Sequence, residues 1–388
     1  MGHKATFLKD VLICSLGAYG GPEAHYGVFT AQLVEKKNYL SAQELQELIA
    51  LTALLPGPSS TQTITAIGYR LGGPFLAFLT LMVWAFPVLS VMTLMAVLGR
   101  VSEIAPWREG LFRYIGPMAL GFVLFALYKM IRLSSGEPKR LMSLVVVVPV
   151  VYFFPSFMLY LGVMLGLGLM TLRLDRVPFE TPQLKQKPRW GLLGVFGFFL
   201  IALPLLALSG DVWWVLADRF YRFGASVIGG GQVLVPYMVH TLVNTLSVIT
   251  TETFMIGYGL VQGLPGPMFS FTAFVGAEAA ASLSFGAQLF TAAISSLMIF
   301  LPGTLLIFFI APLWQDVRSL SWIKSALKGV RLGAIAIILV TFIQLAQNTS
   351  WSPLALGVTA VSVLGLGSKK IPAPLIVLAT LGLGLVLR

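Results

Sequence analysis

Charged residues are scarce in this chain. Asp, Glu, Lys and Arg together make up only 11% of the 388 residues, whereas 57% are hydrophobic, and the mean hydropathy is +0.88. Soluble domains are about a quarter charged, so this chain has too few polar side chains to cover itself with a water-facing surface. A soluble globular protein is therefore excluded.

Cysteine and histidine are scarce as well. The single cysteine, Cys14, excludes a disulfide framework and a thiolate metal cluster. The three histidines (His3, His25 and His240) are widely separated, and neither an HExxH-type pair nor a GxxxxGK[ST] motif is present. We therefore expect no metal and no cofactor, and ATP cannot drive this chain directly. A membrane-embedded enzyme would need a nucleophile with a base, paired carboxylates or metal ligands, so an enzyme is the less favoured class.

Long apolar runs are what the chain has instead. A helix needs roughly twenty apolar residues to cross a hydrocarbon core about 30 Å thick, and runs of that order recur throughout. The clearest lie at 74–98, 114–131, 191–209, 289–310 and 332–347. The sequence therefore predicts an all-α polytopic integral membrane protein embedded in a lipid bilayer.

The net charge of +11 needs an explanation in this context. In a soluble protein such a surplus would suggest a nucleic-acid partner. In a membrane protein, basic residues gather in cytoplasmic loops and orient the helices. We expect the second explanation to hold and no nucleic acid to bind.

The two halves of the chain share a pattern of helix-breaking residues. Gly20-Gly21-Pro22 is followed after 36 residues by Pro56-Gly57-Pro58. Gly229-Gly230-Gly231 is followed after the same interval by Pro265-Gly266-Pro267, so the two halves are offset by 209 residues. The constant interval and the shared order indicate an internal duplication.

Further matches extend the duplication. At the same offset, Ser41 with Glu44 lies opposite Thr250 near Glu252, and each pair is typical of a helix N-cap followed by an acid. An apolar helix with an internal proline follows in both halves, at Pro87 and, after a six-residue insertion, at Pro302. We therefore divide the chain into a first repeat at 1–172, a linker at 173–190 and a second repeat at 191–388.

The distribution of basic residues predicts opposite orientations for the two repeats. The linker carries five Lys or Arg residues, which favours a cytoplasmic location. Lys36-Lys37 of the first repeat corresponds to Thr245-Leu246 of the second, and no Lys or Arg occurs between Phe223 and Val317. This asymmetry indicates an inverted repeat, an arrangement that many transporters with alternating access share.

The first Pro-Gly-Pro motif interrupts an apolar helix at a point rich in hydrogen-bond donors. Proline cannot continue the helical hydrogen bonds and glycine adopts torsions closed to other residues, so two half-helices, spanning or re-entrant, are expected to meet there. The second half-helix starts with free amides and a favourable dipole for anions. Its first residues add hydroxyl and amide donors: Ser59, Ser60, Thr61, Gln62 and Thr63.

Such a cluster suits a small oxyanion, because all of its oxygens accept hydrogen bonds. The second motif continues with Met268, Phe269 and Ser270 and is less polar, so the first break is expected to do more of the binding. The alternative is that the breaks only kink the helices and that the hydroxyls bond to nearby carbonyls. The occurrence of two matched breaks in a duplicated chain favours the binding role.

Other polar residues lie near these breaks. Ionisable groups within apolar segments are costly and therefore often functional, and the candidates for charge or proton coupling are Glu23, His25, Arg70 and Glu278. Arg70 can supply positive charge to the anion or extend to the membrane interface. The glycine runs, with Gly20, Gly21, Gly229 and Gly230, either open the backbone towards a cavity or permit close helix packing. Gln232 and His240 are weaker candidates.

Several of these segments resemble a known family. The segments SLGAYGGPEAHYGVF, VEKKNYL and ALLPGPSSTQ resemble the N-terminal domain of the chromate ion transporter family, and VIGGGQVLVPYM with GLVQGLPGPMFSF resembles its C-terminal domain. The likeness covers roughly 6–132 and 215–346, and the linker lies where long members of the family join their domains. It implies efflux of chromate across the bacterial cytoplasmic membrane, with sulfate as a similar competitor.

These observations converge on a secondary transporter that exports a small tetrahedral oxyanion, chromate first and sulfate second. An inside-negative potential drives a dianion outward at about 2.3 kcal/mol per charge per 100 mV. An anion channel of the same fold is the first alternative. A structural subunit that acts through partners is disfavoured by the duplicated breaks, and the sequence leaves a homodimer open.

Overall fold

The structure is a computed structural model of the whole chain. It describes residues 2–53, 55–99, 110–134, 138–154, 156–180, 186–227, 234–317, 320–347, 349–368 and 370–387. Within these ranges every regular element is a helix and no strand is present. The all-α prediction is therefore confirmed.

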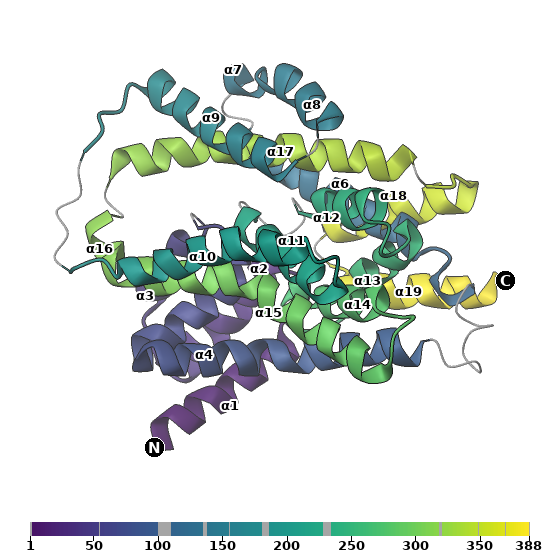
Figure 1. Cartoon of the computed structure of the whole chain (residues 1–388), viewed down its shortest axis with the longest axis horizontal. Coiled ribbons are helices and arrows are strands. Elements are labelled where there is room, and N and C mark those ends of the chain that lie inside the picture. Colours follow the sequence, from purple (N-terminus) through teal and green to yellow (C-terminus); the bar gives the residue numbers. More distant parts are fainter. Residues whose placement is uncertain are drawn as a thin grey trace.

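The elements of the first repeat are α1 (Gly2–Gly17), α2 (Pro22–Phe29), the π-helix η1 (Thr30–Lys36), α3 (Ala42–Thr52), α4 (Ser59–Leu98), α6 (Ile115–Leu133), α7 (Pro138–Leu141), α8 (Leu144–Phe153) and α9 (Phe157–Asp175). Figure 1 shows them in purple to teal. The α4 ribbon contains a sharp break, since Gly72 and Gly73 have non-helical torsions, with Gly73 at φ +74°. Pro74 follows at once, so α4 consists of a half-helix at 59–71 and a long helix at 74–98.

The elements of the second repeat are α10 (Trp190–Ala207), α11 (Val212–Ser226), α12 (Val235–Val239), the π-helix η3 (His240–Thr245), α13 (Thr251–Val261), η4 (Met268–Ser270), α14 (Phe271–Ala279), α15 (Phe285–Ile310), η5 (Ala311–Leu313), α16 (Trp314–Val317), α17 (Ser321–Gln347), α18 (Pro353–Ser368) and α19 (Ala373–Val386). Here the half-helix α14 and the long helix α15 are separate, because Ser284 caps α15 and accepts a hydrogen bond from the Ala287 N–H.

Within the described residues, six helices are long and apolar enough to cross a membrane. They are Ser59–Leu98, Gly110–Arg132, Met158–Asp175, Trp190–Ala207, Phe285–Leu313 and Ser321–Gln347. The apolar runs found in the sequence fall in five of them, and Met158–Asp175 is an addition. Large apolar side chains such as Phe86, Phe198 and Leu364 remain exposed, as expected for surface that faces lipid tails. The chain is a multi-pass membrane protein.

Backbone features recur at the 209-residue offset. Both repeats contain a π-helix at the same place, η1 and η3. Each π-helix is followed by a residue at φ +51°, Asn38 in one and Ser247 in the other. The predicted N-caps are also confirmed: the Ser41 hydroxyl accepts from the Glu44 N–H and the Thr250 hydroxyl from the Thr253 N–H. These matches show that the duplication extends to the local backbone geometry.

The two repeats run in opposite directions through the molecule. Figure 1 shows α4 ending at the right of the molecule and α15 ending at the left, beside α16, so these two long helices run antiparallel. The hairpin formed by α3 and residues 59–71 (the first hairpin) lies on the left, the side of the linker between α9 and α10. The hairpin formed by α13 and α14 (the second hairpin) lies on the right. We call these two sides the linker face and the opposite face.

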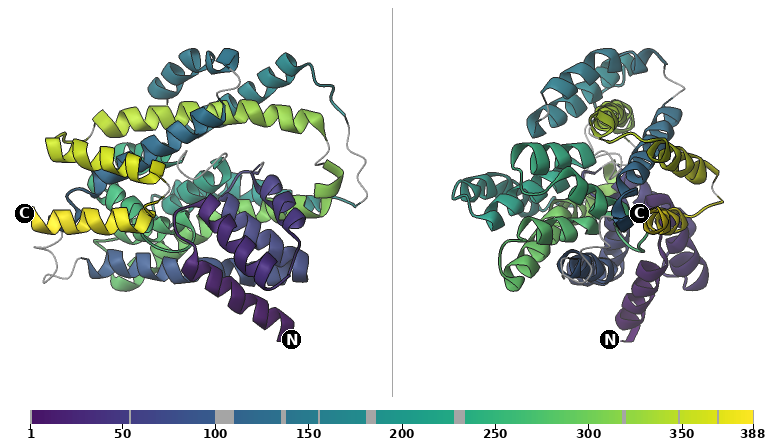
Figure 2. Two further views of the ribbon diagram at one scale, coloured as in Figure 1. Left: turned by 180° about the vertical axis from the view of Figure 1, so that it is seen from behind. Right: turned by 90° about the vertical axis from the view of Figure 1, so that its right-hand side faces the viewer.

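The helices form two bundles, each with contributions from both repeats. The hairpin bundle contains α1–α4 and α10–α16, with α11, α14 and α4 packed on α15. The arm bundle contains α6–α9 and α17–α19, with α9 and α8 packed on α17 and α18 and α19 packed on α6. The two views of Figure 2 show the same separation. The bundles meet where α6 contacts α13 and where α17 contacts α12.

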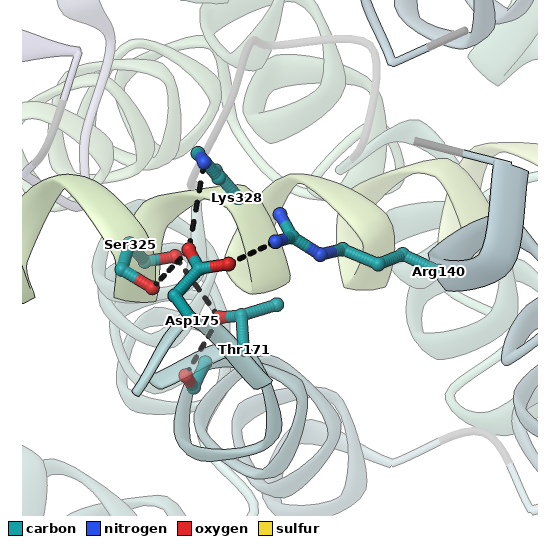
Figure 3. Close-up of polar contacts among 6 residues, drawn as sticks. Arg140, Thr171, Asp175, Ser325 and Lys328 are labelled. Carbon is teal, nitrogen blue, oxygen red and sulfur yellow. Dashed lines mark hydrogen bonds and ion pairs between the residues drawn. The ribbon is translucent and has the colours of Figure 1, made fainter. Parts of the chain in front are cut away.

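The start of the linker is fixed to the arm bundle. Helix α9 continues to Asp175 and so includes the first three residues of the predicted linker. The Asp175 carboxylate pairs with Arg140, accepts a hydrogen bond from the Ser325 hydroxyl at 2.7 Å and lies 3.4 Å from the Lys328 ammonium (Figure 3). Since Ser325 and Lys328 belong to α17, this network ties the two repeats together on the linker face.

Candidate functional site

Both Pro-Gly-Pro motifs have backbone conformations that favour glycine. Gly57 has φ +131° and Gly266 has φ +110°, a region that residues with a Cβ rarely adopt. The Gly57 N–H donates to the carbonyl of Val227 at 2.7 Å, and the Gly266 N–H donates to the carbonyl of Ala18 at 2.8 Å. Ala18 and Val227 are themselves equivalent at the 209-residue offset, so each break is held by the chain that precedes the glycine run of the other repeat.

Each break also lies against the proline helix of the other repeat. A Cβ on Gly57 would lie 3.0 Å from the Cα of Gly303, and a Cβ on Gly266 would lie 2.9 Å from Cγ1 of Val88. Gly303 and Val88 directly follow Pro302 and Pro87, so these contacts match the six-residue shift inferred from the sequence. The two breaks are thus interlocked at the middle of the hairpin bundle by a reciprocal set of contacts.

The first turn of α4 carries the polar residues of the first break. Its N-cap is Pro58, which provides no side-chain cap, and the first intrahelical bond runs from the Gln62 N–H to the Pro58 carbonyl. The N–H groups of Ser59, Ser60 and Thr61 therefore have no acceptor within the helix. With the helix dipole, these groups form the type of terminus at which proteins bind anions.

Two aromatic side chains hold the hydroxyl groups of this turn. Nδ1 of His25 lies 2.9 Å from the Ser60 hydroxyl, and the Trp84 indole N–H donates to the Thr61 hydroxyl at 3.2 Å. The rings of His25 and Trp84 meet edge to face, with centroids 5.3 Å apart. All four side chains are buried. Three separate elements, α2, the half-helix and the long part of α4, thus position one compact polar cluster.

Gln62 completes the first break. Its side-chain amide donates to the Pro56 carbonyl at 2.8 Å and to the Gly303 carbonyl at 3.2 Å. These two acceptors assign Nε2, so Oε1 points the other way, and within the described residues this buried oxygen has no hydrogen-bond partner. A buried acceptor without a donor is costly, and because an oxyanion has no proton to donate, this oxygen suits a water molecule and not the anion. The amide donors that the sequence suggested for the anion are used by the Pro56 and Gly303 carbonyls instead. A further bond joins the hydroxyls of Thr52 and Thr63 at 2.7 Å and fixes α3 to α4.

The second break has the same backbone but few of these polar groups. Phe269, Phe271 and Leu234 occupy the positions equivalent to Ser60, Gln62 and His25. Ile299 occupies the position of Trp84, and the buried Ser270 hydroxyl, equivalent to Thr61, has no hydrogen-bond partner in the described part of the chain. The second break thus offers fewer donors, in line with the sequence.

The remaining predicted site residues are spread over several parts of the fold. Gly20 and Gly21, at φ +89° and +96°, form the turn before α2, whereas Gly229, Gly230 and Gln232 fall outside the described residues.

Of the charged candidates, Arg70 pairs with Glu44 at the start of α3 and is half-exposed, and Glu278 is buried near the end of α14. Glu23 is the second residue of α2, but its side chain is outside the described part. Pro265 and Pro267 flank Gly266 in the second break, and His240 begins η3.

Sequence reasoning missed Trp84 and two buried carboxylates. Asp10 of α1 accepts hydrogen bonds from Gln32 and Tyr39, each at 2.8 Å. Asp218 of α11 pairs with Arg222 at 2.7 Å and with Arg219 at 3.2 Å. Alignment of the repeats at the 209-residue offset places Arg219, the neighbour of Asp218, opposite Asp10. Charged residues at equivalent positions of two apolar helices were therefore a sequence signal for both carboxylates. Trp84 lies three residues before Pro87, but only the fold brings it to Thr61.

Comparison with known proteins identifies the family. A family model described as chromate transporter matches residues 5–172 and 214–385, and so covers most of both repeats. The chain belongs to the chromate transporter family. This is a family of membrane transporters and not of enzymes.

Three relatives of this chromate transporter family member align over nearly the whole chain. A chromate transport protein of Cupriavidus metallidurans is 27% identical over 95% of this chain and 89% of its own length. A probable chromate transport protein of Synechococcus elongatus is 24% identical over 97% and 94%, and an uncharacterized transporter of Methanocaldococcus jannaschii is 24% identical over 98% and 92%. No solved structure matches the chain.

Proposed function

We propose that the protein is a secondary transporter that exports a small tetrahedral oxyanion, with chromate as the first choice, and that the anion binds at the start of α4. The observation that carries this proposal is the first turn of that helix. Three N–H groups without an intrahelical acceptor lie beside the hydroxyls of Ser60 and Thr61, which His25 and Trp84 hold in place. Free N–H groups at a helix N-terminus suit a small anion.

The second break supports this role in a different way. Its Gly266 lies against Val88 in α4, as Gly57 lies against Gly303 in α15. A shift of either proline helix therefore acts on the break of the other repeat. Because the repeats are antiparallel, such a shift is a natural step in alternating access, in which the same site opens first to one side and then to the other.

The charge distribution supports an orientation. The linker, with Arg173, Arg176, Lys187 and Arg189, emerges on the linker face, which we assign to the cytoplasm by the positive-inside rule. We assign the protein to the cytoplasmic membrane of a bacterium. Efflux of a dianion then follows the membrane potential, at about 2.3 kcal/mol per charge per 100 mV. The buried His25, in contact with Ser60, is our candidate for a coupled proton.

The test is uptake of radiolabelled chromate into everted membrane vesicles that contain the protein. We expect energised, saturable accumulation, with excess unlabelled sulfate as a second condition that measures selectivity. Accumulation without saturation would indicate the channel alternative. If vesicles with inserted protein take up no more than empty vesicles, chromate is not the substrate.

A further inference from the structure

A polar cavity lies between the two bundles on the opposite face. Its volume is about 990 Å³, and it is lined by the beginning of α6, the first turns of α13 and the end of α17. Arg113, Thr251, Glu252 and Ser350 give it a polar wall. Figure 1 places these helix ends on the side of the C-terminus, away from the linker.

Helices α6 and α13 make a close contact beside this cavity. Gly116 and Pro117 of α6 and Met255 and Ile256 of α13 still line the cavity. One turn further along α13, a Cβ on Gly259 would lie 2.3 Å from Cγ2 of Ile115 and 3.3 Å from the Met118 side chain. We call this the α6–α13 contact. Because Gly259 has no side chain, the two helices can approach each other this closely at the wall of the cavity.

The first repeat does not reproduce this contact. Met255 and Gly259 of α13 and its C-cap Gln262 are buried. The equivalent residues of the first repeat, Gln46 and Ala50 of α3 and its C-cap Ala53, are exposed. The helix that corresponds to α6 in the second repeat is α17, yet α3 packs mainly on α4 and η1. Two repeats with the same backbone thus differ in how their hairpins meet the arm bundle.

In an inverted repeat, such a difference has a conformational meaning. Exchanging the arrangements of the two repeats turns a protein that is closed on one face into one that is closed on the other. The exposed stripe on α3 carries Gln43 and Gln46, which are suited to water and poorly suited to lipid tails. The outer part of the stripe is therefore polar, as a mouth open on the linker face requires, and Ala50 and Ala53 continue it with small side chains.

We propose that the cavity between α6, α13 and α17 is the mouth through which the oxyanion leaves on the opposite face, and that the α6–α13 contact is the gate that closes it. The exposed stripe of α3 is the corresponding gate surface on the linker face, and it is open in this conformation. This inference rests on the proposed transport function for its substrate. The position of the gates is independent of which anion is carried.

The first experiment locks the gate with a disulfide. The background is Cys14→Ala, which removes the single cysteine. The test variant combines Gly259→Cys with Ile115→Cys, whose Cβ atoms would be 3.6 Å apart, within the range of natural disulfides. Oxidation is expected to reduce chromate uptake to the level of empty vesicles, and a reductant is expected to restore it. Full uptake by quantitatively cross-linked protein would overturn the gate.

A matched control uses the other side of the same helix. Gly121→Cys with Ser362→Cys joins α6 to α18 inside the arm bundle. The new Cβ would lie 2.8 Å from both the Ser362 Cβ and the Thr359 carbonyl oxygen, so the two helices must separate to reach disulfide geometry, and normal membrane insertion of this variant is checked first. Because both helices move together in our account, oxidation of this pair should leave uptake unchanged. Loss of uptake in the control as well would mean that the first result reports rigidity of α6 and not a gate.

The second experiment needs no transported substrate. Single cysteines replace Gln46 on α3 and Ser350 at the cavity, and a membrane-impermeant thiol reagent is applied from each side. We expect Gln46→Cys to react only from the linker face and Ser350→Cys only from the opposite face. Labelling of both from one side would overturn the inference. The expected labelling without any chromate uptake would instead contradict the proposed substrate alone.

Discussion

The first and second breaks share a backbone and differ in their side chains. Both have a Pro-Gly-Pro turn with a positive φ at the glycine, and both donate an N–H to the chain before the other repeat's glycine run. The first surrounds its helix start with His25, Ser60, Thr61 and Trp84, whereas the second has Leu234, Phe269, Ser270 and Ile299 at the equivalent positions.

This comparison separates two tasks. Backbone features that the repeats share are required by the architecture, because each break supports the other. Side chains that only the first repeat has are free to serve a ligand. Duplication followed by divergence of one copy therefore explains why the donors gather in a single break, while the other break retains its geometry and becomes apolar.

The largest expected effect comes from the shared backbone. Gly57→Val places a branched side chain at φ +131° and against Gly303, with strain on the order of 1–3 kcal/mol before the clash is counted. We expect transport to be abolished while the protein still inserts, and the same for Gly266→Val. The measurement is vesicle uptake together with the amount of protein in the membrane.

The control for these variants is Gly197→Val in α10. A Cβ at Gly197 would have no neighbour within 4 Å, so transport should be unchanged. Normal transport by Gly57→Val would remove the first break from the mechanism.

The opposite orientation of the repeats predicts that equivalent positions are labelled from opposite sides of the membrane. Lys37 follows η1 and Leu246 follows η3 at the same offset. In the Cys14→Ala background, Lys37→Cys and Leu246→Cys should each react with an impermeant thiol reagent from one side only, and the two sides should differ. Reaction of both from the same side would contradict the inverted arrangement.

A smaller effect is expected from the side chains that only the first repeat has. His25→Leu copies the residue of the second repeat and leaves the buried Ser60 hydroxyl without its present partner, at a cost of about 1–3 kcal/mol. Because the Ser60 hydroxyl is proposed to bind the anion, uptake at low chromate concentration should fall roughly tenfold. Initial rates over a range of chromate concentrations would measure this effect. His25→Gln, which can still bond to Ser60, should keep more activity, and equal loss in both variants would indicate a role for the imidazole itself.

The smallest effect is expected at Arg70. Its guanidinium pairs with Glu44 on a half-exposed surface, and such pairs contribute about 0–1 kcal/mol. The pKa of Glu44 is lowered mainly by the hydrogen bond from the Ser41 N–H, so the helix cap keeps its charge without Arg70. Arg70→Ala should change chromate uptake less than about twofold. A complete loss of uptake would show that Arg70 meets the anion during the cycle.

Much of the fold was predictable because it depends on local chemistry. Proline and glycine act through the backbone, so the two breaks and their spacing could be recognised without knowing what surrounds them. The caps at Ser41 and Thr250 likewise depend on a few neighbouring residues. Length and apolar character were enough to identify five of the six long helices found in the described residues.

The site itself was less predictable because it depends on contacts between distant elements. Trp84 reaches Thr61 only because the chain turns at Gly72 and Gly73 and brings the long part of α4 back past the break. The pairing of Arg70 with Glu44 requires α3 and the half-helix to lie side by side. The linker was predicted to start at Arg173, but the bonds of Asp175 to Ser325 and Arg140 extend α9 into it.

The most direct test of the account is equilibrium dialysis of radiolabelled chromate with the purified protein, in wild type, Ser60→Ala and Ser270→Ala. A hydrogen bond to a charged ligand is worth about 1.5–3 kcal/mol, or roughly a ten- to hundredfold change in affinity. We predict saturable binding by wild type and Ser270→Ala and strongly weakened binding by Ser60→Ala. Unchanged binding by Ser60→Ala, with loss in Ser270→Ala, would place the anion at the second break and contradict the account.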